Sequence, residues 1–101
     1  MALEHLRASL TKGNLWLHIL AELQGGDATP GELRARVLAK RRFEPAAITF
    51  YSVIYRMSRE GLVRRSSDSY RSAYAITPKG REELAKALDL LAEVRKGLSQ
   101  P

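Results

Sequence analysis

The sequence contains no cysteine, so the protein forms no disulfide and has no thiolate for catalysis or for binding zinc. It has two histidines, His5 and His18, and these do not form the cluster that a metal site needs. A glycine-rich phosphate loop and a carboxylate pair suited to acid–base chemistry are also missing. We therefore expect no enzyme activity, no cofactor and no bound metal.

Long apolar stretches are missing as well. No segment approaches the run of about 18 apolar residues that marks a membrane-spanning helix. Residues 1–6 lack the basic segment followed by an apolar one that is typical of a secretory signal. We expect a soluble cytoplasmic protein with no membrane partner, and 101 residues suffice for one modest hydrophobic core.

Positive charge is concentrated in the middle of the chain. Residues 34–71 hold ten basic and three acidic side chains, a net charge of +7, whereas the rest holds seven basic and eight acidic ones. Arginines outnumber lysines twelve to five, which suits bidentate phosphate recognition, although genomic composition or growth at high temperature produces the same bias. Charge gathered in one segment predicts an anionic partner.

The stretch from Pro45 to Gly80 organises the chain. We predict a helix over residues 45–60 whose first turn is fixed by Pro45, a stop at Gly61, a two-stranded ribbon over residues 62–76, and a new helix from Pro78. This order of helix, ribbon and helix is typical of a winged helix-turn-helix. The fold class we expect is mainly α with a small β-hairpin, plus a C-terminal dimerisation helix.

The predicted helix 45–60 has two different faces. At about 100° per residue, its apolar side chains gather on one side, facing a core: Phe50, Val53, Ile54 and Met57. The other side mixes aromatic rings, a hydroxyl and guanidinium groups: Tyr51, Ser52, Tyr55, Arg56 and Arg59. These groups suit contacts with phosphates and base edges. A partly exposed helix whose tyrosines pack on neighbouring elements is the alternative.

The N-terminal part predicts two helices. Residues 12–24 carry a broad apolar face with Thr11 as a plausible N-cap, and Trp16 in this face either joins the core or a dimer contact, or lines a ligand pocket. The capping box at residues 29–32 starts a second helix that runs to about Lys40, with Leu33, Val37 and Leu38 expected toward the core. Residues 1–9 allow a short extension helix that packs on a partner subunit or frays.

Two groups of cations flank the predicted helix 45–60. Lys40, Arg41 and Arg42 end the preceding helix, where they also favour its dipole. The ribbon carries Arg64, Arg65 and Arg71, which fit a wing that touches phosphates, although a solvated hairpin tolerates them too. In the return strand, we expect residues 70, 72, 74 and 76 on one face and residues 71, 73 and 75 on the other.

The last predicted helix covers residues 78–97. Its apolar positions follow alternating steps of three and four residues, as in a coiled coil: Leu84, Ala87, Leu88, Leu91, Val94 and Leu98. Such a helix packs on its own domain or pairs with a second copy. We favour a homodimer, with a winged-helix domain over residues 1–80 and a dimerisation helix over residues 78–101.

From Leu10 to Leu84 the chain resembles the PadR family of winged-helix transcriptional regulators. The resemblance rests on residues 10–13, on Gly31-Glu32-Leu33, on Thr49-Phe50-Tyr51 continuing to Val63, and on residues 71–80, Arg-Ser-Ala-Tyr-Ala-Ile-Thr-Pro-Lys-Gly. The family's third helix usually starts with a small polar cap, where this chain has Glu44-Pro45-Ala46-Ala47.

The resemblance implies a dimer that binds double-stranded DNA and represses transcription, with Thr49 and Tyr51 in contact with DNA. We therefore expect a sequence-specific regulator that binds a pseudo-palindromic operator through residues 45–60 and the wing. The alternative is a winged-helix module that docks an acidic protein. A small-molecule effector of unknown identity stays open, as do the operator and the regulated genes.

Overall fold

The computed structural model describes residues 1–66 and 72–101. Its helices are α1 (Ala2–Leu10), α2 (Leu15–Leu23), α3 (Pro30–Arg41), α4 (Ala47–Arg59) and α5 (Pro78–Leu98), with a 3-10 turn, η1, at Lys12–Asn14. The strands β1 (Val63–Arg65) and β2 (Tyr74–Ile76) form an antiparallel hairpin. The predicted fold class, mainly α with a small β-hairpin, is confirmed.

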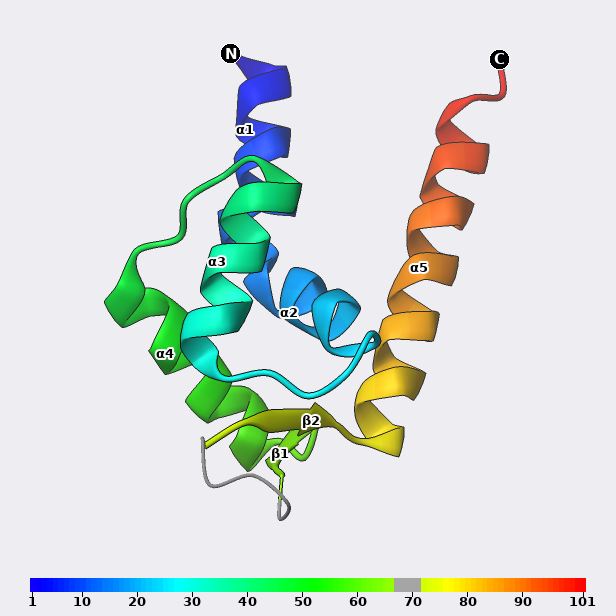
Figure 1. Ribbon diagram of the computed structural model, residues 1–101. Helices are drawn as coiled ribbons and strands as arrows, with labels where there is room; N and C mark the ends of the chain where they lie inside the picture. The colour runs from blue at the N-terminus through cyan, green and yellow to red at the C-terminus, as the bar shows by residue number, and fades with distance from the viewer. Residues whose placement is uncertain (67–71) are drawn as a thin grey trace.

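The core lies where α2, α3 and α4 meet above the hairpin. Each helix contributes the apolar stripe that its 3.6-residue period predicts, and the hairpin and α5 close the base. The buried side chains include Leu15, Ile19, Leu20, Leu23, Leu33, Val37, Phe50, Ile54, Met57, Val63, Ile76 and Leu84. As Figure 1 shows, α1 and α5 extend from this core away from the hairpin, so both chain ends lie at the same end of the molecule.

The hairpin is short but tied to the helical domain on both sides. Val63 pairs with Ile76 and Arg65 with Tyr74 in β1 and β2. On the other edge, Ala28, just before α3, exchanges two backbone hydrogen bonds with Tyr74, at 2.8 and 3.1 Å. The hairpin is thereby fixed beside α4, whose C-terminal end reaches β1 (Figure 1).

Two glycines explain the sharp corners at the base. Gly61 has a φ of +79° and ends α4, where the Leu62 N–H donates to the Met57 carbonyl at 2.9 Å. Gly80 lies in the first turn of α5, so close to the chain that an added Cβ would lie 2.2 Å from the Leu62 carbonyl oxygen. Thr77 caps α5 by accepting from the Gly80 N–H at 3.0 Å.

Three local predictions in the helical part are wrong. Thr11 does not cap a helix from residue 12: its hydroxyl donates to the Arg7 carbonyl at 2.7 Å, ending α1, and the 3-10 turn delays α2 to Leu15. Pro45 does not begin α4, because its carbonyl accepts from Arg34 Nε at 2.9 Å and the helix starts at Ala47. Leu38 is exposed, since it projects about 100° from its neighbour Val37 on the core face.

The return strand is shorter than the sequence predicted. Ser72 has a φ of +61°, which interrupts the extended backbone, so β2 begins only at Tyr74. Ala73, Ala75 and Ile76 are all buried, so both faces of this short strand are covered. Tyr70 and Arg71 lie outside the described residues.

Candidate nucleic-acid interface

The predicted contact residues of α4 are exposed. Ser52, Tyr55 and Arg59 lie opposite the buried stripe of this helix, with Thr49 and Arg56 on one flank and Tyr51 on the other. Thr49 and Tyr51 are therefore about 160° apart around the helix axis, and they face different sides of the outward surface. The exposed surface of α4 presents hydroxyls, rings and guanidinium groups together.

The guanidinium groups of this surface are available to a partner. Arg59 Cζ lies 5.8 Å from the ring centre of Tyr55, a stacking arrangement that leaves its N–H groups free to turn outward. Arg56 has no hydrogen-bond or ion-pair partner among residues 1–66 and 72–101. Within residues 45–60, the one carboxylate is that of Glu60, at the C-terminal end of the helix.

The three cations at the end of α3 differ in whether they have an ion-pair partner. Arg41 donates to Glu22 Oε2 from Nε at 3.2 Å and Nη2 at 2.9 Å, and Lys40 Nζ reaches Glu22 Oε1 at 3.3 Å. Arg42, the next residue, is exposed and unpaired within the described chain, with a left-handed backbone at φ 60°. Of the three, Arg42 is the cation most available to a phosphate.

Glu22 is the one charged residue in the described part of the chain that is buried, with 6% of its surface exposed. Burial alone raises the pKa of its carboxyl, but the hydrogen bonds and charges of Arg41 and Lys40 outweigh burial and lower the pKa below its ordinary value. Glu22 is therefore ionised at neutral pH. Its ion pairs join α2 to α3 and position the turn that leads into α4.

The hairpin presents Arg64 and Arg65 to solvent. Arg65 Nη2 donates to the Ser72 hydroxyl at 2.8 Å, across the hairpin just beyond the Arg65–Tyr74 pair, which positions its guanidinium at the end of the strands away from α5. The third predicted wing cation, Arg71, lies outside the described residues. Of the three wing arginines, Arg64 and Arg65 therefore lie on the strand that follows the C-terminal end of α4.

Two exposed residues beside this surface were not predicted. Lys12 lies with Thr49 in the lining of two pockets, near the N-terminal half of α4. Ile48 is 86% exposed in the first turn of α4. Lys12 was visible in the segment that resembles the regulator family, but its place beside α4 depends on the 3-10 turn, which the sequence did not reveal.

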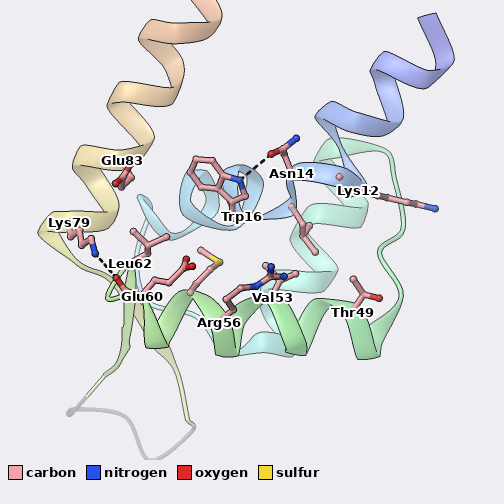
Figure 2. A pocket seen from close by; sticks show the side chains of 13 residues that line it. Lys12, Asn14, Trp16, Thr49, Val53, Arg56, Glu60, Leu62, Lys79 and Glu83 are labelled. Carbon is pink, nitrogen blue, oxygen red and sulfur yellow. Dashed lines mark hydrogen bonds between the residues drawn. The ribbon is translucent and has the colours of Figure 1, made fainter. Parts of the chain in front are cut away.

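A pocket of about 770 Å³ lies along the Arg56 flank of α4 (Figure 2). Trp16 from α2 forms one wall, and its indole N–H donates to Asn14 Oδ1 at 3.2 Å. The remaining lining combines apolar and charged groups, including Leu15, Val53, Met57, Leu62, Lys12, Arg56, Lys79, Glu60 and Glu83. Trp16 therefore both packs against the core and lines a pocket, and these were the alternatives left open by the sequence.

A continuous part of α5 and all of α1 leave apolar residues uncovered. We call this set of side chains the end-helix surface: Leu3, Leu6, Leu10, Leu88, Leu90, Leu91, Val94 and Leu98. No residue of α1 is buried. Leu84, which the sequence assigned to a dimer seam, is 3% exposed and belongs to the core of its own domain, while Ala87 is half-buried at the boundary.

Other kinds of site find no support in the described residues. Residues 1–66 and 72–101 contain no group of three side chains able to hold a metal ion. None of the helices in this part of the chain combines the length and apolarity needed to cross a membrane.

Comparison with known proteins identifies the fold. No family model matches the chain, and no curated protein matches it. A transcriptional regulator from Clostridium thermocellum has a similar structure, with a TM-score of 0.79 and 20% identity over 91% of this chain and 93% of its own. A PadR-like transcriptional regulator from Bacillus cereus aligns with a TM-score of 0.68 and 22% identity over 92% of this chain and 98% of its own. The chain thus has the winged-helix fold of PadR-like regulators, as its sequence resemblance indicated.

Proposed function

We propose that this protein is a sequence-specific DNA-binding transcriptional regulator. The observation that carries the proposal is the exposed surface of α4, where Ser52, Tyr55, Arg56 and Arg59 face outward with no carboxylate among them. In helix-turn-helix proteins the second helix of the motif enters the major groove. In this chain α3 and α4 form that motif, so α4 is the reading helix.

The charges around α4 fit a DNA backbone on either side. Arg42 lies before its N-terminus, and Arg64 and Arg65 follow its C-terminus on the hairpin. Cations placed on both sides of a groove-binding helix contact the phosphates that flank the bases being read. Lys12, on the same side as Thr49, adds a further cation to this surface.

The protein would act as a homodimer through the end-helix surface. Exposed apolar side chains in rows along two helices, α1 and α5, are costly to leave in water and are typical of a site where another chain packs. Pairing of α1 and α5 with those of a second copy would bury these rows and present two α4 helices. Such a dimer reads two half-sites of a pseudo-palindromic operator, and occupation of that operator would repress transcription.

The pocket beside α4 gives the protein a place for a small-molecule effector. Arg56 lines the pocket and also belongs to the exposed surface of α4. A ligand bound against Trp16 and Arg56 would compete with DNA for the same guanidinium.

Binding of a labelled random-sequence duplex across a salt series tests the proposal. Fluorescence anisotropy should show tight binding at low salt with a steep negative log–log slope, because each neutralised phosphate releases counterions. Substitution of both Arg64 and Arg65 by alanine should flatten the slope by about one unit for each lost contact. Absence of binding at low salt would overturn the proposal. The alternative would then be that this protein docks an acidic protein, and the search would turn to that partner.

A further inference from the structure

Ile48 is the most exposed large apolar side chain of the described residues apart from the chain-terminal Met1. It is the second residue of α4, and 86% of its surface is accessible. Single apolar residues on a surface are common and usually mean nothing. Ile48 differs from such residues because it lies in the exposed surface of α4 that is proposed to read DNA.

Ile48 begins the outward stripe of α4. Steps of four, three and four residues place one line of side chains opposite the buried stripe: Ile48, Ser52, Tyr55 and Arg59. The N-terminal residues of a recognition helix contact base edges in helix-turn-helix complexes. Ile48 therefore lies where a recognition helix contacts base edges in the major groove.

No packing role inside the chain explains this isoleucine. It belongs neither to the hydrophobic core nor to the partly buried side chains around the core. It is also not part of the end-helix surface, which belongs to α1 and α5. Its neighbours on α4 are the exposed Tyr51 and Ser52, both able to hydrogen-bond.

The chemistry of the major groove offers one apolar partner. The edges of the base pairs present hydrogen-bond donors and acceptors, and the only methyl group among them is the C5-methyl of thymine. An isoleucine placed against a polar edge would cover donors and acceptors that it cannot satisfy, which costs binding. Against a thymine methyl, the same side chain removes apolar surface from water.

We propose that Ile48 contacts the C5-methyl group of one thymine in each half-site and makes that thymine part of the sequence that the protein selects. The inference rests on the proposed function, because it needs α4 in the major groove. It adds to that function a specificity-determining residue and the chemical group that the residue recognises.

The test removes the methyl group from the DNA and the side chain from the protein separately. A preferred site is first selected from a random duplex library. Each thymine of the site is then replaced by deoxyuridine, which lacks only the C5-methyl group, and binding is measured for the unchanged protein and for Ile48→Ala. At one thymine per half-site, deoxyuridine should weaken binding of the unchanged protein about fourfold, the value of one buried methyl group, and should not weaken binding of Ile48→Ala.

A matched control separates this contact from general loss of apolar surface. Leu38→Ala also removes an exposed apolar side chain, from α3 instead of the outward stripe of α4, and should keep the full deoxyuridine effect. Thermal unfolding should show that Ile48→Ala folds as stably as the unchanged protein, because the position is exposed and alanine favours helix.

The outcomes are distinguishable. If deoxyuridine has no effect at any thymine, or weakens Ile48→Ala as much as the unchanged protein, the methyl contact is refuted while DNA binding stands. If the protein binds no duplex and selects no site, the proposed function fails and the inference with it.

Discussion

Arg41 and Glu22 join α3 to α2 through a partly buried ion pair, with Arg41 Nη2 2.9 Å from Glu22 Oε2. Two nitrogens of the guanidinium donate to this carboxylate, so the main role of Arg41 is to hold the domain together. A bidentate pair fixes the direction of both side chains. Because α3 leads directly into the turn before α4, the pair also fixes where the proposed reading helix lies.

Glu22→Gln should destabilise the fold by roughly 1–3 kcal/mol, since it leaves Arg41 and Lys40 without their charged partner. The pKa of Glu22 is lowered in the folded protein, so its contribution to stability is present above its ordinary value of 4.5 and disappears as pH falls through the lower folded value. Urea unfolding should therefore show that the free energy of unfolding falls less between pH 7 and pH 3 for Glu22→Gln than for the unchanged protein. An identical pH dependence in both would show that the pair contributes nothing.

Gly80→Ala should destabilise the protein by about 1–3 kcal/mol, because the new Cβ would meet the Leu62 backbone oxygen and the structure must shift. Gly97→Ala is the matched control: it lies in the same helix with nothing within 4 Å of the added Cβ, and it should be neutral or stabilising. Thermal unfolding of the two variants measures the contrast. Equal melting temperatures would show that α5 does not dock as closely on Leu62 as described.

Arg42 occupies a left-handed backbone position at the end of α3, where glycine is usually preferred. Arg42→Gly should therefore keep or raise the melting temperature, while it weakens binding to random-sequence DNA and lowers the salt slope by about one unit. Arg42→Lys keeps the charge and should bind nearly as well as the unchanged protein. Unaltered DNA binding by Arg42→Gly would remove this residue from the phosphate-contacting set.

The end-helix surface should hold two copies of the chain together. Leu91→Glu with Val94→Glu places two carboxylates in the exposed stripe of α5 and should convert a dimer to a monomer in sedimentation equilibrium. Lys96→Glu lowers the net charge by the same two units from the opposite side of the same exposed helix and should leave the dimer intact. A double variant that sediments as a dimer would place the interface elsewhere.

The sequence predicted the fold well wherever a local signal and the hydrophobic period agreed. The capping box at Thr29 and Glu32, the stop at Gly61 and the start at Thr77-Pro78 are all where the sequence placed them. Each of these signals acts through backbone hydrogen bonds within a few residues, so no knowledge of tertiary contacts is needed.

Predictions failed where distant contacts decide the outcome. The Arg34 side chain holds the Pro45 carbonyl from eleven residues away and moves the start of α4. Glu22 engages Lys40 and Arg41 across helices, a pairing that charge counting along the chain could not reveal. Ile48 was overlooked although its angular position opposite Phe50 was already readable within the predicted helix 45–60, because the sequence does not show that this apolar side chain stays uncovered in the fold.

The measurement that tests the central claim most directly is DNA binding by Ser52→Glu, compared with Ala85→Glu. Ser52 lies at the middle of the exposed surface of α4, whereas Ala85 is exposed on α5, so the two variants add the same charge in different places. If α4 enters the major groove, a carboxylate at residue 52 meets the phosphate-rich groove, and anisotropy at low salt should show binding reduced by about 100-fold or more, against little change for Ala85→Glu. Equal affinities for the two variants would contradict the assignment of α4 as the DNA-reading helix.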